Sequence, residues 1–163
     1  MQAVKIEKGL KNKSFHECMN LLEKVEYLII HHTDRNNDFP LFVKLRHKYF
    51  RGWDDIGYHY LIGNAGIFAE NGKIYTGRNE SFEGAHARGY NKNSLGICLI
   101  GDFDKIVPSE KQFEALFSLL ERKMKEHHIP VKNILGHSEL PNVDKSCPGD
   151  LLNMDYVRAM LSS

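Results

Sequence analysis

Two short aliphatic runs of the sequence end in histidine, and a cysteine follows the second run. Residues 29–30 are isoleucines that precede His31, and the run 134–136 precedes His137. Cys147 comes ten positions after His137, across a polar loop that could fold back. Histidine and cysteine bind zinc, and a catalytic zinc site takes three protein ligands and leaves one position open. His31, His137 and Cys147 are therefore candidate ligands of an open metal site.

Each of these residues also has an ordinary structural interpretation. A histidine at a strand end is more often a hydrogen-bonded structural residue, and a lone cysteine is more often a small buried side chain. His32 competes with His31 for the same role. Because neighbouring side chains of an extended segment point to opposite faces, only one of these two histidines can enter the site.

The composition indicates one folded domain of ordinary character. The chain has 163 residues, of which 42% are hydrophobic and 26% are charged, as in globular proteins. Its net charge of +1 argues against a protein that grips nucleic acid by bulk charge. Three cysteines form no disulfide framework. Nine histidines are more noteworthy, because histidine is the commonest metal ligand.

No targeting or membrane signal is visible in the sequence. The first residues contain no apolar run that could serve as the core of a signal peptide. No apolar stretch approaches the ~18 residues of a membrane-spanning helix. We therefore expect synthesis in the cytoplasm, so that any action outside the cytoplasm would need release by other means.

The elements that must position the candidate ligands belong to an α/β domain. Aliphatic and aromatic runs predict five strands, over 25–30, 58–62, 73–76, 95–100 and 134–136. In open α/β sheets the binding crevice lies beyond the carboxyl ends of the strands, where His31 and His137 would meet. The polar segment 78–94 is expected to be a long, functional surface loop.

Helices are predicted in four places. A capping box of Ser109 and Gln112 opens the clearest one, which continues to His128 before Pro130. Another starts at a cap by Asp38 and should bury a stripe of apolar side chains, namely Leu41, Phe42, Leu45 and Tyr49. Shorter helices are predicted over about 15–23 and over 153–161. Residues 1–24 are expected to be part of the same domain as residues 25–163.

Five ordered blocks of the sequence resemble the zinc-dependent N-acetylmuramoyl-L-alanine amidases of type 2. This family includes phage endolysins and animal peptidoglycan recognition proteins. The blocks are IIHHT at 29–33, GWDDIGYHY at 52–60, GAHARGYN at 84–91, NSLGIC at 93–98 and GHS at 136–138, and KSCPG at 145–149 completes them. The resemblance runs from about Tyr27 to about Leu152. It implies a single α/β domain over 25–163, with a mixed central β-sheet flanked by helices and a zinc cleft at the C-terminal ends of the strands.

The resemblance also implies roles for individual residues. His31, His137 and Cys147 would hold one Zn²⁺ ion. Tyr58 matches the active-site tyrosine of the family, and Lys145 matches the lysine that phage-type and bacterial members place beside the scissile carbonyl. On residue type alone, Tyr58 would be a packing residue and Lys145 a solvated charge.

Three further residues are candidate substrate contacts. His86 lies in the block that lines the substrate cleft of the family, and Asn93 is a weaker candidate of the same kind. Trp53 could stack on a sugar ring, although core packing explains it equally well. The sequence departs from the family's coliphage members in residues 1–24 and in a longer loop between His137 and Cys147.

The implied reaction is hydrolysis of the amide between N-acetylmuramic acid and L-alanine in peptidoglycan. We expect a phage or prophage endolysin that is released to act on the periplasmic cell wall. The alternatives are a cytoplasmic amidase that recycles anhydro-muropeptides and a non-catalytic muropeptide-binding protein; the complete ligand set and Lys145 argue against the latter. We expect a monomer whose partner is peptidoglycan or a muropeptide, not nucleic acid or a membrane. RNA polymerase is a candidate partner by resemblance only, because a coliphage member inhibits one.

Overall fold

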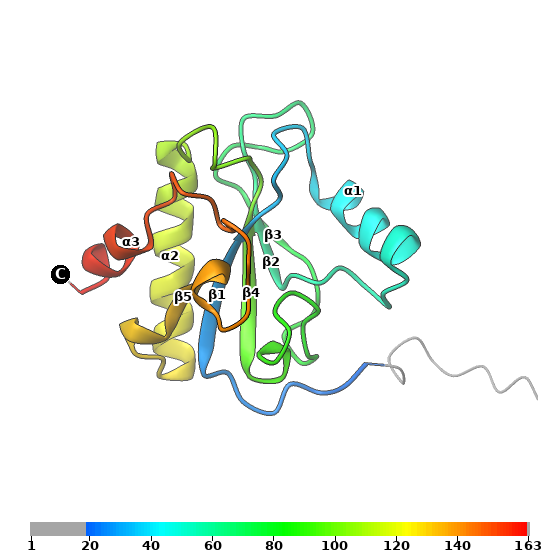
Figure 1. Ribbon diagram of the computed structural model, residues 1–163, viewed down its shortest axis with the longest axis vertical. Coiled ribbons are helices and arrows are strands. Elements are labelled where there is room, and N and C mark those ends of the chain that lie inside the picture. Colours follow the sequence, from blue (N-terminus) through cyan, green and yellow to red (C-terminus); the bar gives the residue numbers. More distant parts are fainter. Residues whose placement is uncertain (1–18, 163) are drawn as a thin grey trace, which may run out of the picture.

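The structure, a computed structural model that describes residues 19–162, is built on a five-stranded mixed sheet (Figure 1). Its strands in chain order are β1 (Tyr27–His32), β2 (Tyr60–Ile62), β3 (Ile74–Thr76), β4 (Ser94–Leu99) and β5 (Ile134–Gly136). They lie in the order β3-β2-β4-β1-β5. The pairs β2–β4, β4–β1 and β1–β5 are parallel, whereas β3 runs antiparallel to β2. The expected mixed α/β sheet is confirmed, with all five strands near their predicted places.

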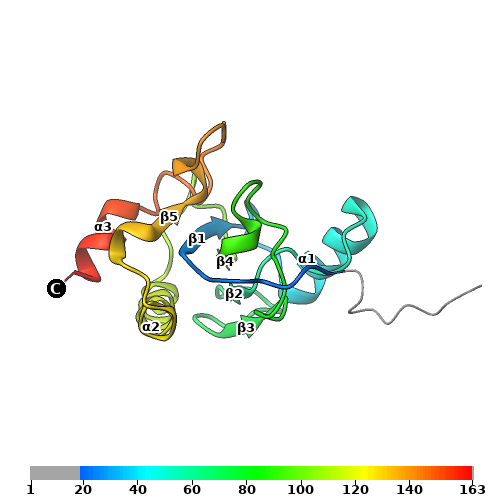
Figure 2. The same cartoon turned by 90° about the horizontal axis from the view of Figure 1, so that it is seen from below.

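Helices flank this sheet on two sides. They are α1 (Pro40–Leu45), which a π-helical turn continues over Arg46–Phe50, α2 (Glu110–His127) and α3 (Met154–Met160). Figures 1 and 2 show α2 and α3 together on one side of the molecule and α1 on the other. No helix of the described residues is both long and apolar enough to cross a membrane.

The two faces of the sheet carry different side chains. The main core lies between the sheet and α2, where Leu28 and Ile30 of β1 pack in one cluster with Leu116 and Leu120 of α2. Ile29 belongs to a separate cluster on the other face. Because side chains alternate along a strand, His31 shares the face of Ile29, and His32 lies beside Phe103 of the main core. The predicted separation of the two histidines is thus confirmed.

The long helix follows its sequence signals closely. The side chain of Ser109 accepts a hydrogen bond from the backbone N–H of Gln112, and the Gln112 side chain accepts one from the backbone N–H of Ser109. The helix ends at His128, which adopts the left-handed conformation with φ of 56°. Gln112 also donates from Nε2 to the carbonyl of Ile100 at 2.9 Å, which ties the start of α2 to the end of β4.

The prediction for the first helix is wrong in two respects. Its N-cap residue is Phe39, while both carboxylate oxygens of Asp38 accept hydrogen bonds from Arg46, at 2.8 and 2.7 Å. The apolar stripe is not buried, since its members are between 38% and 76% exposed. Val43 and His47, four residues apart, form the buried stripe instead. A helix that contacts the sheet along so narrow a line leaves its opposite side in solvent.

The helix predicted over about 15–23 lies largely outside the described residues. In the described part, residues 19–23 are extended: Leu21 forms an isolated bridge with Phe82, and the N–H of Leu22 donates to the carbonyl of Ser81 at 2.9 Å. The segment therefore follows the loop 78–94 rather than forming a helix there. The final helix is observed as α3, within the predicted range 153–161.

Candidate metal centre

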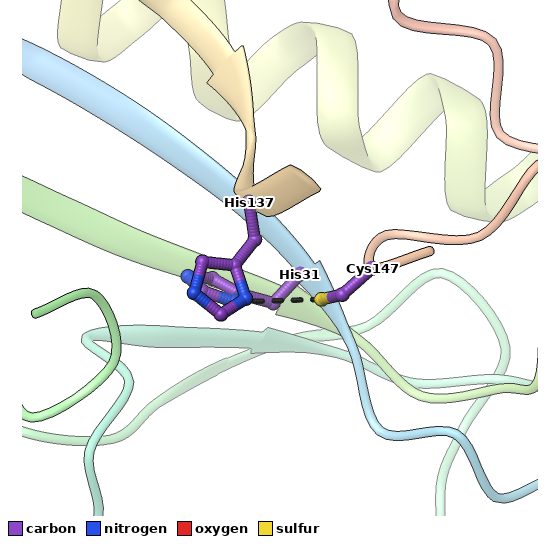
Figure 3. Close-up of side chains that lie close together, drawn as sticks. All are labelled: His31, His137 and Cys147. Atoms are coloured by element: carbon purple, nitrogen blue, oxygen red, sulfur yellow. Dashed lines mark hydrogen bonds between the residues drawn. The ribbon is translucent and has the colours of Figure 1, made fainter. Parts of the chain in front are cut away.

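His31 lies together with His137 and Cys147, which come more than a hundred positions later in the sequence (Figure 3). His31 is near the end of β1, His137 directly follows β5, and Cys147 belongs to the loop between β5 and α3. One ligand atom of each residue lies within 4.8 Å of those of the other two. The Sγ atom of Cys147 is 3.6 Å from Nδ1 of His31, and the rings of His31 and His137 are 4.6 Å apart between centroids.

This donor set fits a zinc ion. Tetrahedral zinc with Zn–N distances of about 2.0–2.1 Å and Zn–S of about 2.3 Å places neighbouring ligand atoms about 3.5 Å apart. Burial lowers the pKa of His31 well below its usual value, and burial and then the charge of Lys145 lower that of His137. Both rings are therefore neutral at pH 7, as metal ligation requires. Burial raises the pKa of Cys147 to about 11, so metal binding displaces a thiol proton.

His32 is directed away from this cluster by its own hydrogen bond. The backbone N–H of Phe103 donates to Nδ1 of His32 at 3.2 Å. A neutral imidazole has a single N–H, so an accepting Nδ1 places that proton on Nε2 and leaves no free lone pair for a metal. The nearby group of His32, Asp34 and Asp104 is therefore a poorer metal site, although its ligand atoms also lie within 4.8 Å of one another.

The turn that carries His137 is braced by an acidic side chain. Oε2 of Glu139 accepts a hydrogen bond from the backbone N–H of Gly136 at 2.6 Å. Both carboxylate oxygens of Glu139 also pair with Arg158 of α3, at 2.9 and 2.8 Å. The backbone N–H of Ser138 donates to the carbonyl of Cys147 at 2.6 Å, so the second and third candidate ligands are tied to each other.

A second carboxylate holds the loop of Cys147. The hydroxyl of Ser146 donates to Asp104 at 2.5 Å, and the backbone N–H of Asp150 donates to the other oxygen of that carboxylate at 3.0 Å. These bonds flank Cys147 on both sides. The hydrogen bond from Ser146 holds the pKa of Asp104 below its usual value, so this carboxylate stays charged at neutral pH.

The candidate ligands line a cleft with a volume of about 470 Å³. Four other residues expected at the site also line it, namely Tyr58, Lys145, Trp53 and His86. Asn93 is outside the cleft, and its side-chain amide donates to Glu26 at 3.0 Å. Of the eight residues expected at the site, the structure therefore brings seven together and leaves Asn93 apart.

Tyr58 and Lys145 face the ligands in different states of burial. The ring of Tyr58 is 5.1 Å from that of His31 between centroids, and burial raises the pKa of Tyr58 well above its usual value. Its hydroxyl is therefore protonated at neutral pH. Lys145 is exposed, and its positive charge adds to the effect of burial on the pKa of His137 and opposes the burial that raises the pKa of Cys147, which places an ammonium group at the rim of the ligand cluster.

Two further buried histidines, His47 in the lining of the cleft and His59 outside it, have structural roles that could not be predicted from the sequence. Nδ1 of His59 accepts a hydrogen bond from the backbone N–H of Gly96, and Nδ1 of His47 accepts one from that of Gly57, both at 3.0 Å. Burial lowers the pKa of each histidine to about 4. The sequence around His47 holds no signal of this role, whereas His59 has a glycine neighbour: a Cβ atom at Gly84 would lie 3.0 Å from its Cε1.

Known proteins match this chain over most of its length. Residues 21–150 match the family described as N-acetylmuramoyl-L-alanine amidase. Peptidoglycan-recognition protein LB of Drosophila melanogaster is 39% identical over 107 residues, which are 65% of this chain and 43% of that protein. The chain thus spans less than half the length of this curated relative.

Two solved structures share the fold. The endolysine N-acetylmuramoyl-L-alanine amidase LysCS from Clostridium intestinale URNW has a TM-score of 0.79 at 29% identity, with 88% of each chain covered. The ectodomain complex of the peptidoglycan recognition proteins LCa and LCx, bound to tracheal cytotoxin, has a TM-score of 0.70 at 28% identity, with 82% of each chain covered.

Proposed function

The chain belongs to the N-acetylmuramoyl-L-alanine amidase family, and on that premise we propose that it is a zinc hydrolase. Its reaction is cleavage of the amide between N-acetylmuramic acid and L-alanine in peptidoglycan. The observation that carries this proposal is the convergence of His31, His137 and Cys147 in one cleft with Lys145. A protein that only bound muropeptides would have no need of a complete set of metal ligands beside a free ammonium group.

The proposed chemistry divides between the cofactor and the side chains around it. One zinc ion held by His31, His137 and Cys147 would lower the pKa of a water molecule to about 7 and polarise the amide carbonyl. Lys145 stabilises the negative charge that develops on the carbonyl oxygen during attack. Tyr58 keeps its proton at neutral pH, so its hydroxyl is a hydrogen-bond donor in the cleft wall rather than a group that removes a proton.

We propose that the wall of the cleft around Trp53 orients the substrate. The indole ring lies 4.7 Å from the ring of His47 between centroids, and the guanidinium of Arg51 lies 5.2 Å from its centroid. A flat apolar ring beside a cation suits a sugar ring with polar substituents. We place the saccharide end of the substrate here, with the scissile amide nearer Lys145.

We further propose that the substrate is the cell-wall polymer and that the chain is a phage or prophage endolysin. The match with LysCS, which is described as an endolysine, covers 88% of each chain, and this similarity in extent supports the role. In this role the chain acts on the periplasmic wall after release from the cytoplasm.

The test is hydrolysis by the purified full chain loaded with one equivalent of zinc. We expect new L-alanine amino termini when purified peptidoglycan is the substrate, and no new reducing sugars. The control is Cys147→Ser, which should retain the fold but lose stoichiometric zinc and release no L-alanine termini. Binding of peptidoglycan without hydrolysis by the zinc-loaded wild type would overturn the enzymatic proposal.

The endolysin role needs its own comparison. Intact sacculi and soluble anhydro-muropeptides are offered to the same preparation at equal concentrations of the amide. Faster cleavage of sacculi supports the endolysin. Cleavage of anhydro-muropeptides alone would replace it with a recycling amidase and leave the amidase chemistry standing.

A further inference from the structure

His86 contacts one of the candidate metal ligands directly, through a pair of ring nitrogens. Nε2 of His31 is 3.1 Å from Nδ1 of His86, which is a hydrogen-bond distance. The other ring nitrogen of His31, Nδ1, is 3.6 Å from Sγ of Cys147, the contact drawn as a dashed line in Figure 3. The two nitrogens of His31 therefore face two different environments, one the ligand cluster and the other His86.

The single proton of a neutral His31 decides which nitrogen can bind a metal. A proton on Nδ1 would point into the ligand cluster and block it. A proton on Nε2 of His31 leaves the Nδ1 lone pair free beside Cys147. The Nε2–H can then donate a hydrogen bond to Nδ1 of His86. We propose that His86 is a positioning residue whose Nδ1 accepts the Nε2–H of His31 and so presents Nδ1 of His31 to the metal. This inference rests on the metal site of the proposed function and adds to it the binding atom and its partner.

The surroundings of His86 hold its ring in one place. A Cβ atom at Gly84 would lie 2.3 Å from Cδ2 of His86, and one at Gly96 would lie 2.5 Å from its Cγ. The backbone N–H groups of His86 and Ala87 both donate to Oδ1 of Asn91, at 2.9 Å. Glycine on two sides and a fixed backbone leave the ring no alternative position, so its Nδ1 stays directed at His31.

A role in substrate contact, for which the sequence makes His86 a candidate, is less compatible with this geometry. Although His86 lines the cleft, its Nε2 is buried and its Nδ1 is directed at His31. Neither polar atom of the ring is left for a ligand in the cleft. Hydrogen bonds of this kind to metal-binding histidines typically change metal affinity by 10- to 100-fold.

Zinc affinity of the full chain, measured by competition with a chromophoric chelator, tests the proposal. His86→Leu removes the acceptor, and we expect zinc binding 10- to 100-fold weaker than wild type. His86→Asn places Oδ1 close to the position of Nδ1, and we expect it to recover most of that loss. His128→Asn, which removes an exposed histidine at the end of α2 and outside the cleft, should keep wild-type affinity.

Wild-type affinity in His86→Leu, or an equal loss in the leucine and asparagine variants, would overturn the proposal. If His86→Leu fails to fold, the ring protons of the wild-type chain decide instead. Two-bond ¹H–¹⁵N correlation spectra of the metal-free protein should show His31 protonated at Nε2; protonation at Nδ1 would overturn the inference. Because these spectra need neither zinc nor hydrolysis, a protein that fails to cleave peptidoglycan would refute the proposed function without affecting this result.

Discussion

His31 and His32 are neighbours in β1, yet their rings make different bonds on opposite sides of the sheet. Nδ1 of His32 accepts from the backbone of Phe103, whereas Nδ1 of His31 faces Cys147. At the scale of residues, then, the strand period and one backbone N–H are enough to distinguish a candidate ligand from its neighbour.

The first prediction separates these two histidines. His31→Ala should lose stoichiometric zinc, because it removes one of three ligands. His32→Ala should retain one zinc per chain, because its ring has no lone pair directed at the cluster. The measurement is the metal content of each purified variant after dialysis. Loss of zinc from His32→Ala would show that the wrong histidine has been assigned.

A second prediction concerns Lys145. Its replacement by methionine keeps an unbranched side chain that is one atom shorter and removes the charge. We expect kcat to fall by about 10²–10³, the usual effect of removing one contact that stabilises an oxyanion, while zinc content is unchanged. Lys132→Met, at an exposed position in the 3₁₀ turn before β5, is the matched control and should retain kcat. Equal rates for the two variants would exclude Lys145 from the reaction.

The ligands could be predicted from sequence because each has a local signal, a histidine where an aliphatic run ends or a cysteine in a short loop. The contact of His31 with His86 could not. It joins positions 55 apart in the sequence and depends on the path of an irregular loop, for which no periodicity exists.

At the scale of elements, α2 and α1 show when a helix can be predicted from its pattern. The apolar positions of α2 meet a broad sheet face, so pattern and burial agree. α1 meets the sheet only along the line of Val43 and His47, so its more numerous apolar side chains remain in solvent. The pattern predicts the helix in both cases, but only tertiary contact decides which side is buried.

The capping box of α2 supports a third prediction. Ser109→Ala removes the acceptor for the backbone N–H of Gln112 and a 2.6 Å hydrogen bond between the Ser109 hydroxyl and Asn71. We expect the free energy of unfolding in urea to fall by about 1 kcal/mol, with hydrolysis unchanged. Ser118→Ala, at an exposed position inside the same helix, should cause no such loss. Equal stability of the two variants would mean that the cap contributes nothing.

At the scale of the whole molecule, strand pairing assembles the site. The sequence predicts five strands, but not that β1 lies between β4 and β5. That order sets His31 beside His137, and it arises from long-range pairing that no local pattern encodes. The buried side chains of His47 and His59 also determine a property of the folded chain as a whole, its stability in acid.

The fourth prediction is loss of stability between pH 6.5 and pH 4. Burial lowers the pKa of His59 to about 4 in the folded chain, against 6.5 when unfolded. Below pH 6.5, His59 of the unfolded chain therefore takes up a proton, whereas the buried His59 ring of the folded chain stays neutral. The contribution of neutral His59 to the free energy of unfolding is fully present above pH 6.5 and is lost as the pH falls to about 4. The shift corresponds to about 3 kcal/mol for His59, and His47 acts in the same direction.

Urea unfolding of the metal-free protein at pH 7 and pH 4.5 measures this loss, without a contribution from zinc release. His59→Asn keeps an acceptor near the N–H of Gly96 but cannot titrate, so the difference between the two pH values should shrink. If the loss of stability between pH 7 and pH 4.5 is the same in His59→Asn as in wild type, the acid sensitivity comes from other groups.

The solvent-facing apolar side of α1 and of the π-helical turn after it also determines how the protein behaves in concentrated solution. Phe50 is 86% exposed and Tyr49 is 76% exposed, on a chain whose net charge of +1 provides little mutual repulsion. Sulfate salts strengthen attraction between apolar surfaces. The protein should therefore salt out readily and be retained on phenyl resins through this exposed helix face.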